Sequence, residues 1–158
     1  MKTIILALTL AVYSFTANCK TSDNEKAPFR FPFTQVDAKW KEFKTPQDRI
    51  AALQIPNNML ASITTEDILL ICLDFPYLSD IFAFDDMDIG LKVVASKFNG
   101  FQEFLTRHDQ IEAMEKVFQR ISSENLYLNS NSDIEIGNNS IRIRILSYLL
   151  GRPEILKN

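Results

Sequence analysis

Hydrophobic residues recur along much of the chain at the three- and four-residue spacing of α-helices. The clearest case is HDQIEAMEKVFQRI (108–121), in which apolar residues stand at positions 111, 114, 117, 118 and 121. This pattern predicts a helix with one buried and one solvated face. The same spacing in DIGLKVVASKF (88–98) predicts a second helix, which the Asn99-Gly100 pair is suited to close.

Capping residues and prolines predict where the helices between residues 45 and 76 begin and end. In TPQD (45–48), Thr45 is suited to be the N-cap, with Pro46 at the first helical position. In TTEDILLICLDF (64–75), Thr64 and Asp67 have capping-box spacing, and Pro76 follows the segment. The sequence therefore predicts an all-α domain over 45–158, either a compact bundle or a helical-repeat-like array of about six short helices.

The segment DIEIGNNSIRIRI (133–145) fits two structures. Its isoleucines alternate around Gly137-Asn138-Asn139, which is typical of a β-hairpin. However, the isoleucines at 141 and 145 also stand four residues apart, as does Leu149, and Ser140 could cap a helix that Gly151 closes. A lone hairpin is only marginally stable without further strands. We therefore expect a helix from about 140 to 150, with a hairpin over 134–145 as the alternative.

Residues 28–44 form an aromatic segment that we call the strap. In PFRFPFTQV (28–36), the two prolines favour extended backbone and place phenylalanines at alternate positions. Leaving three aromatic side chains exposed is costly, so they either lie across a groove of the helical core or add to the interface with a partner. We expect Trp40 to end this extended strap. The candidate partner-binding residues are Phe29, Phe31, Phe33 and Trp40.

The first eighteen residues, MKTIILALTLAVYSFTAN, have the layout of an export signal. A positive charge at Lys2 precedes an apolar stretch from Ile4 to Val12, and small or polar residues follow it. The apolar stretch is shorter than the roughly 20 residues that span a bilayer. Cleavage before Cys19 resembles that of bacterial lipoproteins, whose cysteine is acylated and becomes the new N-terminus. We therefore predict a signal peptide at 1–18 and lipid attachment at Cys19; the alternative is an ordinary secretory signal.

The residues after Cys19 fit a lipid-anchored protein. KTSDNEK (20–26) has no apolar residue, so we expect 19–27 to be a flexible polar tether. One acyl chain anchors a protein only marginally, whereas the two or three chains of a lipoprotein cysteine hold it firmly.

The cysteine followed by Ser, Asp and Glu also resembles lipoproteins of Bacteroidetes bacteria. LQIP, CLDFPYLSDIFAFDD and FNGFQEFLTR, within 45–108, are similar to a helical domain of uncharacterised small lipoproteins from the same bacteria. The resemblance implies a lipid-anchored protein of the bacterial cell envelope, at the outer membrane, and implies no known activity. A periplasmic or secreted protein is the alternative.

Composition excludes several functional classes. Seventeen basic against twenty acidic residues give a net charge of −3, which argues against nucleic-acid binding. Cys72, the only cysteine besides Cys19, lies in the apolar run ILLICL and is expected to be buried. With His108 as the only histidine and four glycines, we predict no catalytic residue, metal site or cofactor. The acidic DDMDIG (85–90) lacks the ligand pattern of a calcium loop, so its aspartates are expected to cap a helix.

These observations together predict a lipid-anchored cell-envelope protein with a binding or structural role. The expected partners are the membrane, through Cys19, and an envelope protein or glycan. One alternative is a small enzyme, or enzyme accessory, that uses carboxylates such as Asp74, Asp80, Asp85 and Asp86. Another is a truncated relative of a larger lipoprotein, because PEILKN (153–158) begins a further helical pattern.

Overall fold

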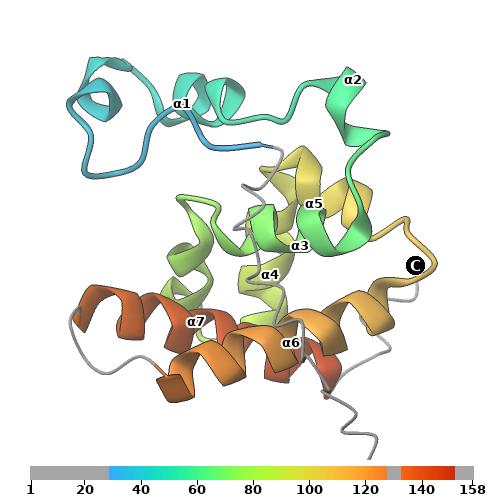
Figure 1. Ribbon diagram of the computed structural model, residues 1–158. Coiled ribbons are helices and arrows are strands. Elements are labelled where there is room, and N and C mark those ends of the chain that lie inside the picture. Colours follow the sequence, from blue (N-terminus) through green and yellow to red (C-terminus); the bar gives the residue numbers. More distant parts are fainter. Residues whose placement is uncertain (1–28, 128–132, 152–158) are drawn as a thin grey trace, which may run out of the picture.

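A computed structural model describes residues 29–127 and 133–151, and all regular elements within these ranges are helices (Figure 1). The all-α prediction is therefore confirmed. The predicted signal peptide, Cys19 and the tether lie outside the described residues. In chain order, the elements are the 3-10 helix η1 (Ala38–Glu42), α1 (Pro46–Ala52), α2 (Asn57–Leu60), α3 (Thr65–Leu73), the 3-10 helix η2 (Leu78–Ala83), α4 (Met87–Ser96), α5 (Asn99–Phe104), α6 (Gln110–Tyr127) and α7 (Asp133–Leu150).

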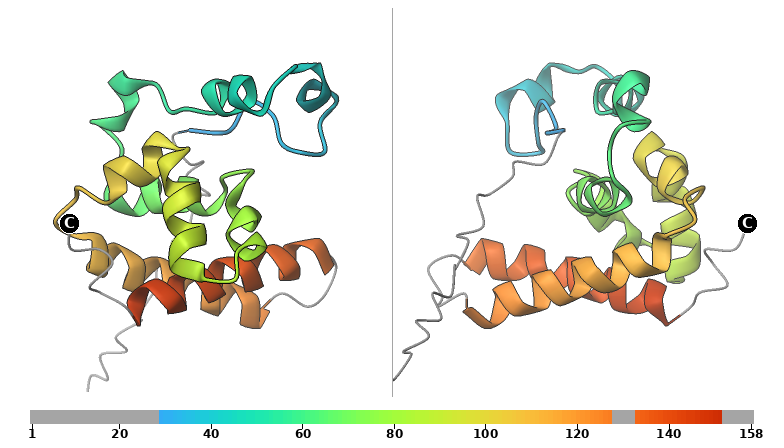
Figure 2. Two further views of the ribbon diagram at one scale, coloured as in Figure 1. Left: turned by 180° about the vertical axis from the view of Figure 1, so that it is seen from behind. Right: turned by 45° about the vertical axis from the view of Figure 1, so that its right-hand side comes forward.

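The helices are arranged in three tiers (Figures 1 and 2). The helices α6 and α7 lie side by side at one end of the molecule, and the strap with η1, α1 and α2 occupies the other end. Between them, α3 packs against α5 and α6, while α4 packs against η2 and α5. The helices α6 and α7 have 18 residues each, so they are longer than the short helices predicted.

The predicted N-caps are confirmed. The hydroxyl of Thr45 accepts a hydrogen bond from the backbone N–H of Asp48, and that of Thr64 accepts one from the N–H of Asp67, both at 3.1 Å. The Asp86 carboxylate accepts a hydrogen bond of 2.7 Å from the N–H of Asp88 and begins α4. These contacts satisfy N–H groups that the first turn of a helix leaves without an intrahelical partner.

The hairpin alternative is wrong, because α7 runs from Asp133 to Leu150 and also begins earlier than the helix predicted from about 140. Ile145 and Leu149 are buried, and Ile141 packs partly buried against the core, so the four-residue spacing decides the structure. The part of the chain that the structure describes contains no strand with which a hairpin could pair. Gly137, expected in the turn, is an exposed position within the helix.

Asn99 and Gly100 begin α5 instead of closing the preceding helix, so that prediction was also wrong. The Asn99 side chain pairs with the backbone of Ile55: its Oδ1 accepts from the N–H at 3.0 Å, and its Nδ2 donates to the carbonyl at 2.8 Å. Gln54 adds to this contact, because its Oε1 accepts a hydrogen bond of 2.8 Å from the Asn99 N–H. The Asn99–Ile55 pair thereby joins the α1–α2 connection to the start of α5.

The core is apolar and rich in aromatic rings. Phe75 and Phe98 stack with their ring centroids 4.6 Å apart and their planes 10° apart. Cys72 is fully buried as a free thiol, as predicted, and its burial raises the pKa of that thiol well above the ordinary value.

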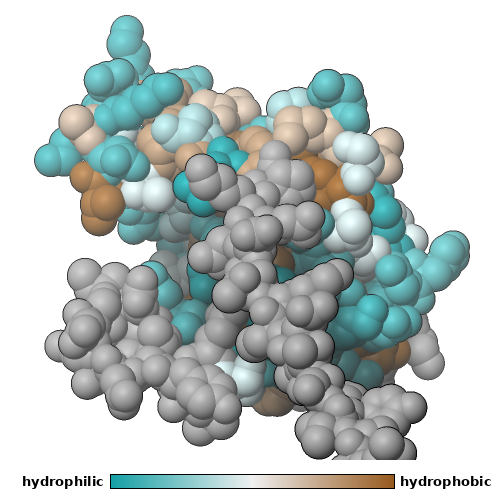
Figure 3. All heavy atoms as spheres, viewed as in Figure 1, coloured by the Kyte–Doolittle hydropathy of each residue, from teal (hydrophilic) through white to brown (hydrophobic). Residues whose placement is uncertain are grey.

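In the view of Figure 3, hydrophobic surface is confined to small areas between hydrophilic ones. Among the helices of the described ranges, none combines the length and apolar composition needed to cross a bilayer. The large hydrophobic side chains that are exposed within these ranges are Val36, Phe82, Phe84, Ile89 and Ile111.

Candidate binding groove

The strap is less extended than predicted. It bends at Pro32 and turns at 35–37, after which η1 begins, so the expectation of an extended segment over 28–44 fails at these points. The turn at 35–37 is closed by the Asp37 carboxylate, which accepts hydrogen bonds from the backbone N–H of Thr34 at 2.5 Å and from the Thr34 hydroxyl at 2.9 Å. The two hydrogen bonds, the N–H first, hold the pKa of Asp37 below its usual range.

The four aromatic residues singled out from the sequence take different positions. Phe33 is only 3% exposed and belongs to the core, where its ring lies 5.9 Å from that of Trp40. Trp40 is half-buried and packs on Tyr77, with the ring centroids 5.1 Å apart. Phe31 and Phe29 are half-buried and contact each other edge to face at 5.3 Å. Only these last two line the groove described next.

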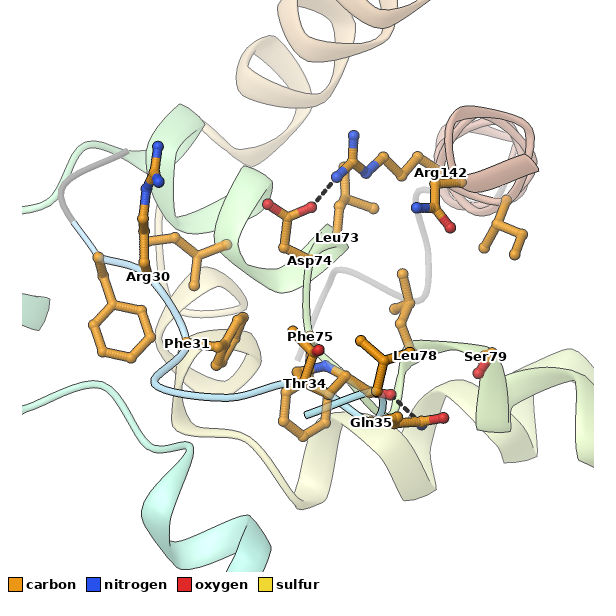
Figure 4. A pocket seen from close by; sticks show the side chains of 16 residues that line it. Arg30, Phe31, Thr34, Gln35, Leu73, Asp74, Phe75, Leu78, Ser79 and Arg142 are labelled. Atoms are coloured by element: carbon orange, nitrogen blue, oxygen red, sulfur yellow. Dashed lines mark hydrogen bonds and ion pairs between the residues drawn. The ribbon is translucent and has the colours of Figure 1, made fainter. Parts of the chain in front are cut away.

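A groove with a volume of about 700 Å³ lies between the strap, the C-terminal end of α3 and α7 (Figure 4). This volume is in the range of about 300–1,000 Å³ typical of small-molecule sites. We call it the strap groove. Its lining combines aromatic and aliphatic side chains with polar ones: Phe29, Arg30, Phe31, Thr34, Gln35, Val36, Ile71, Leu73, Asp74, Phe75, Pro76, Leu78, Ser79, Asn138, Ile141 and Arg142.

An ion pair closes one side of the strap groove. Figure 4 shows the carboxylate of Asp74, from the end of α3, meeting the guanidinium of Arg142, from α7. Arg142 also donates a hydrogen bond of 3.0 Å to the side-chain oxygen of the buried Asn139. The Asp74 side chain remains about half exposed and that of Arg142 remains 28% exposed, so both groups are accessible to a ligand.

The other side of the strap groove is fixed by the strap. The Gln35 amide donates a hydrogen bond of 2.5 Å to the Pro76 carbonyl, which holds the strap against the segment that follows α3. Phe31, a strap residue, packs against the core. Its ring centroid lies 5.9 Å from that of Phe75 and 5.5 Å from that of Phe98. Ring contacts of this kind stabilise a packed arrangement beyond the area that they bury. The groove wall formed by the strap is therefore continuous with the hydrophobic core.

The carboxylates considered for an enzyme lie in different surroundings. Asp74 lines the strap groove, whereas Asp80 lies in η2, 3.9 Å from the ammonium of Lys97. Asp85 and Asp86 are exposed at the start of α4. His108 is exposed in the turn before α6. Within the described ranges, no three His, Cys, Asp or Glu side chains converge as a metal site would require.

Sequence reasoning found two of the groove-lining residues, Phe29 and Phe31, in the role of partner-binding candidates. It named Asp74 as a candidate enzyme carboxylate and did not single out Arg142. The ion pair joins residues 68 positions apart, so it depends on how α7 packs against α3. The available signal was the arginines between isoleucines in SIRIRI (140–145), because a partly buried arginine needs an acceptor.

Comparisons with protein families, curated proteins and solved structures give no match to this chain.

Proposed function

We propose that this chain is a lipid-anchored binding protein of the bacterial cell envelope, with the strap groove as its recognition surface. The observation that carries the proposal is the groove itself. It has the volume of a ligand site, and an aromatic wall faces a small number of charged and amide side chains. Such a combination is typical of binding sites, in which apolar walls supply affinity and a few polar groups orient the ligand.

The sequence of the anchor supports a position close to the membrane. Phe29 is both the first described residue and part of the groove lining. With Cys19 acylated, the chain between the two residues spans at most about 35 Å, because a fully extended chain advances ~3.3–3.6 Å per residue. The proposal therefore places the strap groove within a short distance of the bilayer, where it meets envelope components.

We assign binding rather than catalysis to the strap groove. Asp74 is the only carboxylate among its described lining residues, and Arg142 holds it in an ion pair. Hydrolysis by paired carboxylates needs two such groups roughly 5–10 Å apart. The groove instead offers fixed charges and hydrogen-bonding groups around an apolar wall, which suits recognition.

Photo-cross-linking in the membrane tests whether the strap groove is the recognition surface. We would place benzoylphenylalanine at Ser79, an exposed residue of the groove lining, and at Ser62, an exposed control outside it. The expected result in the membrane fraction is a discrete cross-linked product from position 79 that position 62 does not give. The same products from both positions would contradict the proposal, because they would indicate collisions without a preferred surface.

A further inference from the structure

We propose that the strap groove binds the C-terminal segment of a peptide that ends in an apolar residue. The inference rests on the proposed function and names the class of ligand. The carboxylate of such a peptide would lie at Arg30, and its last side chain would lie on the wall formed by Phe31, Phe75 and Leu78. Three features of the strap groove support this choice.

The first feature is the separation of charge from apolar surface. In Figure 4, Arg30, Asp74 and Arg142 lie along one side of the strap groove, and Phe31, Phe75 and Leu78 lie on the other. A ligand that fills the groove therefore needs a charged end beside an apolar body. The terminal residue of a peptide has both, because its carboxylate and its side chain leave the same carbon atom.

The second feature is the sign of the charge. Two guanidinium groups line the strap groove against one carboxylate, although the whole chain has a net charge of −3. Arg142 is already paired with Asp74, whereas the exposed Arg30 makes no hydrogen bond or ion pair within the described ranges. Arginine binds carboxylates through paired N–H donors, so Arg30, which has no partner among the described residues, favours a ligand with a carboxylate.

The third feature separates a peptide from other amphipathic acids. Thr34, Gln35, Ser79 and Asn138 add hydroxyl and amide groups to the lining. A peptide backbone supplies N–H and C=O groups that can pair with such side chains. Thr34 and Gln35 already bond to Asp37 and Pro76, whereas Ser79 and Asn138 are exposed to water. The acyl chain of a fatty acid supplies no such groups, so its binding would remove water from Ser79 and Asn138 without replacing those hydrogen bonds, at a cost in free energy. The lining therefore favours a peptide over a lipid.

Equilibrium dialysis of the full chain in detergent micelles would test the inference. The probes are acetylated tetrapeptides that end in Phe, Leu, Ile or Val, supplied both as free acids and as C-terminal amides, with laurate as the lipid probe. We expect retention of free acids, detected by mass spectrometry, and at least tenfold weaker retention of the matching amides. Arg30→Gln should weaken retention of the acids at least fivefold. Lys41→Gln, an equal charge change at an exposed lysine outside the groove, should leave it within twofold.

Equal retention of acids and amides, retention of laurate alone, or no retention would each overturn the inference. Circular dichroism of both variants checks that they keep the helical fold. The cross-linking at Ser79 separates this failure from failure of the proposed function. A groove-specific product identified as a glycan or lipid, with no peptide retained, would leave the binding function standing and remove the peptide. If there were neither a groove-specific cross-linked product nor a retained peptide, the binding function and the peptide ligand would both be ruled out.

Discussion

Replacing Gly90 with alanine is expected to lower the free energy of unfolding by about 2–4 kcal/mol. Overpacking a core typically costs about 1–3 kcal/mol, so this cost lies at or above the upper end of that range. Gly90 is buried where α4 packs against η2, and an added Cβ would lie 2.4 Å from the carbonyl oxygen of Ile81. The obstacle is backbone, so it cannot rotate away as a side chain can. Alanine gains about 1 kcal/mol over glycine in a helix, which is too little to offset the clash.

Gly137→Ala is the matched control for that experiment. This glycine also lies within a helix, α7, but it is exposed and an added Cβ would meet no atom within 4 Å. The substitution should therefore raise the free energy of unfolding by up to about 1 kcal/mol. Urea unfolding followed by far-UV circular dichroism measures both effects. Stabilisation by both substitutions would show that α4 and η2 do not approach as closely as described.

Asn99→Asp is expected to lower the free energy of unfolding by about 1–3 kcal/mol at neutral pH, since it removes a donor from the Asn99–Ile55 pair. The Asn99 amide now donates to the carbonyl of Ile55, a residue that is 1% exposed. A carboxylate there would place one of its oxygen atoms against the carbonyl oxygen of Ile55. That carbonyl would lose its N–H donor, which costs about 1–3 kcal/mol in a buried site. A negative charge at the start of a helix returns only about 0.3–1 kcal/mol.

Asn58→Asp controls for the change of charge. Asn58 is exposed in α2, so this substitution should change the free energy of unfolding by no more than about 0.5 kcal/mol. The deficit of Asn99→Asp should also shrink on acidification, because a protonated carboxyl can again donate to Ile55. Thermal unfolding of both variants between pH 4 and pH 7 measures this. Equal losses for the two variants would mean that the Asn99–Ile55 pair contributes nothing specific.

Features that depend on neighbouring residues could be predicted from the sequence. Thr45, Thr64 and Asp86 each cap a helix through a contact with a residue two or three positions ahead, so local chemistry alone fixes them. The burial of Cys72 followed in the same way from the apolar run around it. The helical class likewise needs only the spacing of apolar residues along each segment.

Features that depend on distant residues could not be predicted. An Asn-Gly pair is suited to end a helix. Here Asn99 begins one instead, where its side chain bonds to the backbone of Ile55, 44 positions away. The isoleucines of 133–145 fit both periods, and packing of α7 against the core selects the helix. The strap groove needs the strap, α3 and α7 together. Its aromatic wall was therefore recognisable from Phe29 and Phe31, whereas its charged side was not.

Attachment through Cys19 is the central claim of this account, and the mass of the mature N-terminal peptide tests it most directly. The full chain and Cys19→Ser would be expressed in a bacterial host, and each would be assayed for its N-terminal residue and its partition into membranes. We predict that the wild type begins at an acylated Cys19 in the membrane fraction, and that the variant loses this anchor. Two soluble proteins that begin at another residue would contradict the claim and indicate a secreted helical domain.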